Sequence, residues 1–211
     1  MKDRFERLPL ECSHLYLAIE GRLAAVICVE DPLREEAADA VRELKEAGIT
    51  KVVMMTGDSE RTAAAIAKRV GVDEYYSEVL PEDKASFVEK EKKLGHKVIM
   101  IGDGINDSLA LSSASVGIAI SDGAAIAREI ADVTISADNL HEIVTLKRLS
   151  TALMKRIHNN YRTIIGVNGG LIALGVTGVI MPTTSALLHN LSTLTISLRS
   201  MRNLLPKEEE I

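Results

Sequence analysis

The feature that most constrains the fold is an alternation, from about residue 23 to 137, between short aliphatic or β-branched runs and segments of helical periodicity. This alternation is typical of a parallel α/β layer, because a helix must carry the chain back before the next parallel strand can begin. Strands are expected over residues 23–29, 51–55, 97–101, 116–120 and 132–135. The sequence therefore predicts an α/β fold built on a parallel sheet.

Helix-end signals mark the segments between these strands. Ser59 is an expected N-cap, since its hydroxyl can accept a hydrogen bond from an amide of the first helical turn. Gly71 is the expected end of the same helix, because glycine adopts the left-handed conformation that terminates helices. Helices with comparable signals are expected over residues 32–48, 59–71 and 81–95.

A long uncharged run follows a basic helix. No Asp, Glu, Lys or Arg occurs from Thr163 to Leu198, which is enough for about two membrane passes of ~20 residues. We expect transmembrane helices near 160–181 and 185–205, with both ends cytoplasmic because basic residues flank the pair. The glycines of the first segment are small enough to let membrane helices approach closely. His189 and Asn190 interrupt the second, so a single span plus an amphipathic surface helix is the alternative.

The composition argues against two classes of protein. The net charge of -5 arises from interspersed acids and bases, so the chain lacks the basic surface that nucleic acid requires. Cys12 and Cys28 have no metal-ligand spacing and argue against a disulfide framework. We therefore expect no nucleic-acid partner and no structural zinc site.

The predicted strand over 97–101 runs into the sequence GDGIND. Ligands of open parallel sheets bind beyond the carboxyl ends of the strands. Asp103 and Asp107 can converge on one point, where Mg²⁺ would relieve their mutual repulsion, and Asn106 can donate to a phosphate. The alternative is that Asp103 only caps a turn and that Asp107 only lies near the N-terminus of the following helix. A dinucleotide fingerprint is not expected, since the third glycine of GxGxxG is absent.

Thr56 and Gly57 follow the predicted strand over 51–55, where a hydroxyl and neighbouring amides can hold a phosphoryl group. Alone, this TGD sequence is more often a helix-capping turn, and Lys84 is more often a solvated surface lysine. Together with an acid pair, however, they describe an electrostatic clamp for phosphoryl transfer. No aspartate follows an apolar strand in an Asp-Lys-Thr or Asp-x-Asp context, so the clamp lacks a nucleophile.

Several segments together resemble the phosphorylation domain of P-type ATPases, of the haloacid-dehalogenase superfamily: MMTGDSERTAAAIAKRVGVDEYY, VLPEDKA and VIMIGDGINDSLALSSASVGIAI. DPLREEAADAVRELKEAGI and AREIADVTI are similar to the heavy-metal-transporting class. The resemblance implies a haloacid-dehalogenase-like (Rossmann-like) parallel sheet with helices on both faces, followed by a C-terminal transmembrane helical hairpin. It implies three parts: the end of a nucleotide-binding domain (1–30), a partial phosphorylation domain (31–148) and a membrane region (149–211).

The resemblance also implies roles for the candidate residues. Catalytic roles fall to Thr56, Lys84 and Asp103. Phosphate or nucleotide binding falls to Thr56, Gly57, Asp58, Lys84 and Asn106. Asp103 and Asp107 would hold Mg²⁺, and ATP is the second cofactor implied.

In the second apolar segment the resemblance implies a path for a transported cation, lined by His189, Asn190, Ser192 and Thr193. Imidazole and oxygen ligands suit Mn²⁺, Zn²⁺ or Co²⁺ better than Cu⁺. The transported partner implied is a divalent cation, Mn²⁺, Zn²⁺, Co²⁺ or Cd²⁺. Hydroxyls in such helices often bond to their own backbone, which is the alternative for Ser192 and Thr193.

The sequence departs from the family pattern, because the Asp-Lys-Thr-Gly segment with the phosphorylated aspartate is absent. We therefore expect the C-terminal portion of a pump in the cell membrane, with its α/β domain cytoplasmic. Its partner would be the missing N-terminal part or another chain, and alone it should not turn over ATP. The alternatives are a membrane-anchored phosphatase of the same superfamily and a non-catalytic Mg²⁺- or nucleotide-binding subunit of a split pump.

Overall fold

The computed structural model of this chain describes residues 13–29, 32–102, 106–120, 129–135 and 139–205. The chain divides into two compact units, Met1–Val144 and Thr145–Ile211. Asp103, one of the predicted Mg²⁺ ligands, lies outside the described residues, as does Cys12.

The first unit opens with an antiparallel hairpin of β1 (Ser13–Ile19) and β2 (Arg22–Val29). Glu20 and Gly21 form its turn with φ values of 49° and 73°, the geometry that matches the twist of a two-residue hairpin. β2 confirms the strand predicted over 23–29. Large apolar side chains of both strands are exposed, among them Leu15, Ile19 and Ile27.

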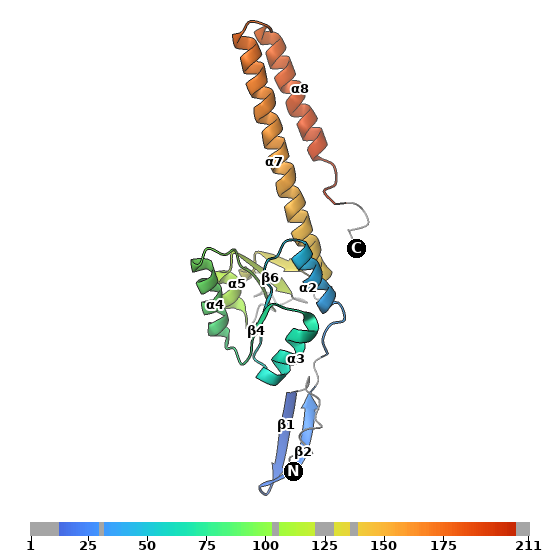
Figure 1. The fold of residues 1–211 in the computed structure, drawn as a ribbon, viewed down its shortest axis with the longest axis vertical. Helices are drawn as coiled ribbons and strands as arrows, with labels where there is room; N and C mark the ends of the chain where they lie inside the picture. Colours follow the sequence, from blue (N-terminus) through green and yellow to red (C-terminus); the bar gives the residue numbers. More distant parts are fainter. Residues whose placement is uncertain (1–12, 30–31, 103–105, 121–128, 136–138, 206–211) are drawn as a thin grey trace. The chain divides into compact units, whose positions relative to one another are not determined.

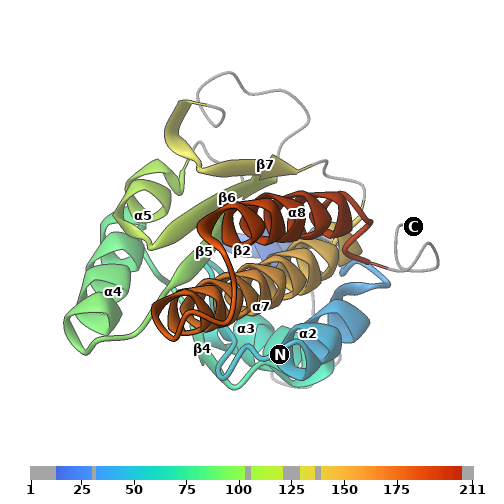
Figure 2. The same ribbon diagram turned by 90° about the horizontal axis from the view of Figure 1, so that it is seen from above.

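The other strands form two short parallel sheets. β3 (Val53–Met55) pairs with β4 (Glu74–Tyr76), and β5 (Ile99–Gly102), β6 (Val116–Ile120) and β7 (Val133–Ile135) pair in that order. Figure 2 shows the second sheet from above. The predicted parallel α/β arrangement is confirmed. β4 was not predicted, because three residues carry too little periodicity to register as a strand.

The helices that the structure describes beside these sheets are α2 (Ala37–Glu46), α3 (Glu60–Val70), α4 (Pro81–Lys93) and α5 (Ser108–Ser113) (Figure 1). The predicted ends of α3 are confirmed, since the Ser59 side chain accepts from the Thr62 amide and Gly71 is left-handed with φ 80°. The predicted start of α2 at Pro32 is wrong. The helix begins at Ala37, after a turn in which the Ala37 amide donates to Arg34 O.

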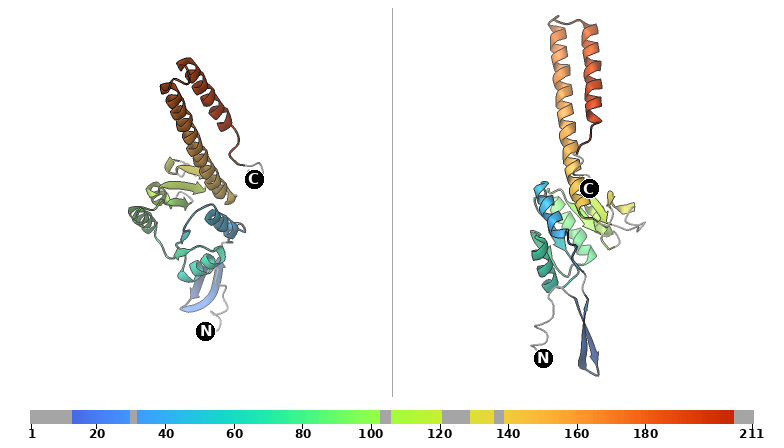
Figure 3. Two further views of the ribbon diagram at one scale, coloured as in Figure 1. Left: turned by 45° about the horizontal axis from the view of Figure 1, so that its top comes forward. Right: turned by 90° about the vertical axis from the view of Figure 1, so that its right-hand side faces the viewer.

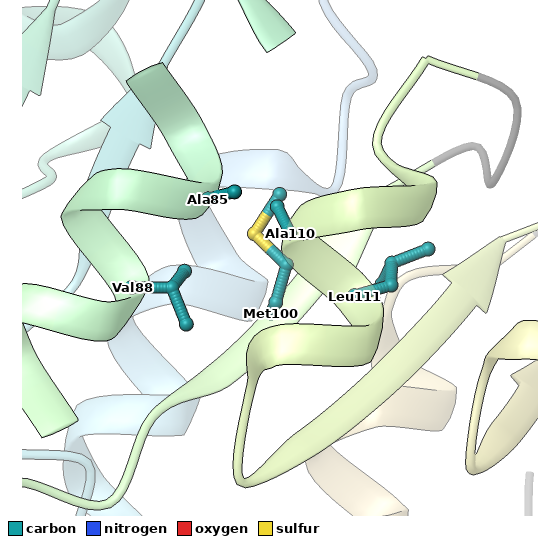
Figure 4. Close-up of a cluster of buried hydrophobic side chains, with 5 residues drawn as sticks. All are labelled: Ala85, Val88, Met100, Ala110 and Leu111. Atoms are coloured by element: carbon teal, nitrogen blue, oxygen red, sulfur yellow. The ribbon is translucent and has the colours of Figure 1, made fainter. Parts of the chain in front are cut away.

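The core of this unit lies between α4, α5 and β5. Its buried members are Ala85, Val88, Met100, Ala110 and Leu111 (Figure 4). Close packing extends to β6, because a Cβ added at Gly117 would lie 2.7 Å from the carbonyl oxygen of Leu111. These contacts fix where β5 ends and where α5 begins.

The second unit is a helical hairpin formed by most of α7 (His141–Val176) and by α8 (Pro182–Ser200), which run side by side (Figures 1 and 3). α7 joins the predicted basic helix and the first apolar segment into one continuous helix. The turn between α7 and α8 contains Gly178, with φ 72°, and Pro182 occupies the first turn of α8.

Two side chains of α7, Arg156 and Asn160, form hydrogen bonds with the end of α8 and the residues after it. The Arg156 guanidinium donates to the carbonyl oxygens of Ser200, Arg202 and Asn203. One turn further along α7, Asn160 Nδ2 donates to Ser200 Oγ at 2.7 Å.

The structure bears on two expectations for these helices, namely that they cross a membrane and that their glycines allow close helix packing. Among the described residues, no helix combines the length and the apolarity needed to cross a membrane. Within the part of the chain that the structure describes, the glycines of α7 make no close contact with another helix, since an added Cβ would meet no heavy atom within 4 Å outside the helix's own backbone at any of them. These are Gly166, Gly169, Gly170 and Gly175.

Candidate functional site

Two predicted site residues of the first unit, Thr56 and Lys84, are each next in sequence to a residue of the hydrophobic core cluster. Met55 ends β3 and packs on the cluster that contains Ala85 of α4 and Met100 of β5. Thr56 comes directly after Met55, and Lys84 comes directly before Ala85. The packing therefore brings the carboxyl ends of β3 and β5 and the first turn of α4 to the same region, as parallel-sheet topology predicts.

The loop after β3 is held by backbone and side-chain hydrogen bonds. The Thr56 amide donates to Tyr76 O, and the Glu78 amide donates to Asp58 O at 2.9 Å. Within the loop, Thr56 Oγ1 donates to Asp58 Oδ2 at 2.7 Å and accepts from the Asp58 amide at 3.1 Å. Thr56 and Asp58 thus form a compact, partly buried turn at the end of the strand.

A largely buried ion pair joins Lys84 to Asp107. Lys84 Nζ lies 2.7 Å from Asp107 Oδ1, and the two side chains are only 16% and 12% exposed. Asp107 is the N-cap residue of α5, yet its side chain makes no capping hydrogen bond. Asp107 therefore lies at the N-terminus of α5, as the alternative has it, but its carboxylate pairs with Lys84 instead of capping the helix, and Lys84 is not a solvated surface lysine.

Gly102 makes room for this pair. A Cβ at Gly102 would collide with Oδ2 of Asp107 and would lie 2.7 Å from its Cβ. The carboxylate therefore packs against the backbone of the last residue of β5, where only glycine leaves space.

The donor chemistry of this site fits Mg²⁺ in the part that the structure describes. Carboxylate oxygens are the ligands that Mg²⁺ takes from proteins, and Asp107 supplies them on a nearly buried side chain. Asp103 lies outside the described residues and Asn106 is exposed. No group of three His, Cys, Asp or Glu side chains gathers as a metal site anywhere in the described ranges.

A second group of predicted residues lies in the helical hairpin. His189 Nδ1 is 2.9 Å from Asn168 Oδ1 on α7. Ser192 Oγ and Thr193 Oγ1 both donate to the carbonyl oxygen of His189, at 2.7 Å and 3.0 Å. The backbone-bonding alternative therefore describes the two hydroxyls in this structure, while Asn190 is exposed.

A shallow hollow of about 550 Å³ contains none of these residues. It is lined by Glu60, Asp73, Glu74, Tyr75, Tyr76 and Ser77. Ser77 and Tyr75 donate to the Glu60 carboxylate, and these hydrogen bonds lower the pKa of Glu60 and raise that of Tyr75. The other two acids are also paired, Asp73 with Lys45 and Glu74 with Lys51, so the three carboxylates of the hollow serve the fold.

Sequence reasoning missed two residues that the structure brings into these groups. Gly102 carried a signal, since it stands between an apolar strand and an aspartate, but its contact with Asp107 depends on the path of the loop. Asn168 lies in the uncharged run, where an amide among apolar residues was a usable signal. Its partner, twenty-one residues later, could not be read from spacing.

A comparison with known families matches residues 2–115, more than half of the chain, to the haloacid dehalogenase-like hydrolases. The chain is 46% identical over 176 residues to the copper-transporting ATPase 2 of Rhizobium meliloti, covering 83% of this chain and 21% of that protein. It is 38% identical over 189 residues to the manganese-exporting P-type ATPase of Mycobacterium bovis, covering 89% of this chain and 26% of that protein.

Among solved structures, the crystal structure of a zinc-transporting PIB-type ATPase in the E2.Pi state superposes with a TM-score of 0.82 at 30% identity. The superposition covers 97% of this chain and 33% of that one. The chain thus spans about a quarter of the length of the curated relatives described above. It belongs to the haloacid dehalogenase-like hydrolase family and is homologous to the heavy-metal P-type ATPases.

Proposed function

We propose that this chain supplies the Mg²⁺ and phosphate half of an aspartyl-phosphorylation site in an ATP-driven metal-cation transporter. The observation that supports this most directly is the nearly buried Lys84–Asp107 pair at the end of β5. In this role Lys84 and Thr56 bind the phosphoryl group, and Asp107 holds Mg²⁺ together with Asp103. The metal, when bound, neutralises phosphate charge, while Lys84 and the Thr56 loop orient the phosphoryl group.

The phosphoryl acceptor comes from outside this sequence. No Asp-Lys-Thr occurs in it, and within the described ranges β3 pairs only with β4 and β5 only with β6. Each of these strands therefore leaves one edge unpaired beside the site, and unpaired edges are ready to accept a further strand. We propose that a parallel strand ending in the acceptor aspartate joins here, from a missing N-terminal part of the pump or a partner chain.

The helical hairpin is proposed to be the membrane part of the transporter. The uncharged run from Thr163 to Leu198 and its exposed apolar side chains support this, as does the likeness to the zinc-transporting ATPase over 97% of this chain. In this proposal the α/β part is cytoplasmic and the hairpin lines the path of Mn²⁺, Zn²⁺, Co²⁺ or Cd²⁺ through His189. The division into 1–30, 31–148 and 149–211 belongs to the same proposal.

The test is phosphorylation in a complemented complex. The chain is purified together with a second chain that carries the preceding part of a heavy-metal pump, including Asp-Lys-Thr-Gly, and is incubated with Mg²⁺ and radiolabelled ATP. We expect label on the second chain, stable in acid and released by hydroxylamine, only when both chains are present. Lys84→Ala and Asp107→Asn should abolish it, whereas Lys90→Ala, an exposed lysine on the same helix, should not.

Other outcomes favour the alternatives. Hydrolysis of p-nitrophenyl phosphate by the chain alone would favour a phosphatase and contradict the need for an external acceptor. ATP binding without any phosphorylation of the complex would favour a non-catalytic nucleotide-binding subunit.

A further inference from the structure

The hydroxyl groups of the uncharged run are mostly engaged within their own helix. Each of Thr163, Thr177, Ser192, Thr193 and Thr195 donates to a carbonyl three or four residues earlier. Such bonds leave the hydroxyl proton unavailable to a neighbouring helix. The polar groups that do reach across between α7 and α8 in this run, among the described residues, are Asn168 and His189.

The orientation of the Asn168 amide in the structure favours one tautomer of the imidazole. Asn168 Oδ1 is a carbonyl oxygen and can only accept, so with this oxygen 2.9 Å from Nδ1 of His189 the contact is a hydrogen bond when Nδ1 carries the proton. A neutral imidazole with its proton on Nδ1 has its lone pair on Nε2. The hydrogen bond therefore selects the tautomer in which Nε2 is free to bind a cation.

We propose that Asn168 is a positioning residue for His189, holding the ring in the Nδ1-protonated form so that Nε2 can take a divalent cation. Metal-binding histidines generally donate their other ring N–H to an oxygen, which fixes the tautomer and raises the basicity of the ligand nitrogen. The proposal rests on the proposed function in one respect, that His189 lies on the path of the transported cation. The tautomer itself depends only on the Asn168 contact.

The experiment uses the full chain in detergent micelles, labelled with ¹⁵N-histidine. The chain has five histidines, and His189→Gln identifies the signals of His189. Two-bond ¹⁵N–¹H correlation then reports which ring nitrogen is protonated. We expect the Nδ1–H tautomer in the unmodified chain and a shift towards Nε2–H in Asn168→Ala. Asn168→Asp retains an acceptor oxygen and should restore the Nδ1–H form.

Co²⁺ alone is the probe for the free nitrogen. Its absorption spectrum gives the Kd for the chain, and Asn168→Ala should weaken binding by about 10- to 100-fold, the usual effect of losing such a partner. Asn168→Asp should recover most of that affinity. Asn159→Ala, which removes an exposed amide from the same helix, should leave both the tautomer and the Kd unchanged.

Three results would overturn the inference: an Nε2–H tautomer in the unmodified chain, a tautomer unaltered by Asn168→Ala, or no Co²⁺ binding that depends on His189. Circular dichroism of each variant separates loss of folding from loss of positioning, and Asn168→Asp provides a second test if Asn168→Ala unfolds. Failure of the phosphorylation test would leave these readouts unaffected, so the two proposals can fail separately.

Discussion

Substituting Gly102 by alanine tests whether the packing of Asp107 against β5 holds the Lys84–Asp107 pair in place. The atoms nearest to the added Cβ all belong to the Asp107 side chain, with its Cγ at 2.8 Å. Relief of this clash requires Asp107 to rotate, because the backbone of β5 is fixed by its parallel pairing with β6. Rotation separates Asp107 Oδ1 from Lys84 Nζ, which now lie 2.7 Å apart.

The expected cost follows from two limits. Inserting a methyl group into a packed site costs about 1–3 kcal/mol. Breaking a buried ion pair by removing one partner costs about 3–5 kcal/mol, which is an upper limit here since a rotated Asp107 can reach water. We therefore expect Gly102→Ala to lower the free energy of opening β5 and α5 by about 1–3 kcal/mol.

Hydrogen exchange followed by mass spectrometry measures this locally in the intact chain, through peptides that cover β5, α5 and β6. Gly57→Ala is the matched control, because its Cβ would meet only the carbonyl oxygen of Val79, at 3.9 Å. In a Lys84→Met background Asp107 can rotate freely, so the effect of Gly102→Ala should shrink, with a coupling of about 0.5–3 kcal/mol. Equal exchange in the two glycine variants, or strictly additive effects, would refute the reasoning.

Three further outcomes follow from the described contacts. Lys45 and the Val52 amide donate to the Asp73 carboxylate and lower its pKa. The stabilisation that ionised Asp73 provides is therefore present above pH ~4 and is lost as the pH falls through the lowered pKa. Acid unfolding monitored by circular dichroism should show a smaller pH dependence in Asp73→Asn. Arg156→Ala should speed amide exchange at the end of α8, because the free energy of local opening falls by about 1.5–3 kcal/mol. Arg156→Lys should recover only part of this free energy, since an ammonium lacks the forked geometry of a guanidinium. Unchanged exchange would contradict the role of the guanidinium. Gly117→Ala should lower the Tm, by the equivalent of about 1–3 kcal/mol, since its Cβ would meet the main chain of Leu111 rather than a movable side chain; a Tm equal to that of the unmodified chain would show that α5 can shift away.

The predictable part of the fold was the part governed by local chemistry. The Ser59 cap, the Gly71 end and the aliphatic runs of β5 and β6 each depend on a few neighbouring residues, and all of them are in the structure. The short strand β4 escaped prediction because its position depends on pairing with β3 rather than on its own pattern.

The sequence indicated which residues belong to the candidate site, but not which of their side chains contact each other. Parallel topology places the ends of β3 and β5 together, so Thr56 and Asp107 could be grouped from the sequence. That Lys84 pairs with Asp107, and that Asn168 pairs with His189, depends on how helices are positioned in space. The helical segments of the uncharged run were likewise predicted, but not that one continuous helix would begin at His141.

Thr56 donates to Asp58 and Lys84 pairs with Asp107, so an anion that binds to either donor has to displace a carboxylate. Each of the two donors already has a carboxylate partner, so under the proposed function binding of a phosphoryl group would exchange one partner for another, and only the difference between the two interactions would contribute to affinity. A singly charged anion offers little advantage over the carboxylate that it displaces. A more highly charged phosphoryl group competes better, so under the proposed function these contacts would discriminate between anions by their charge.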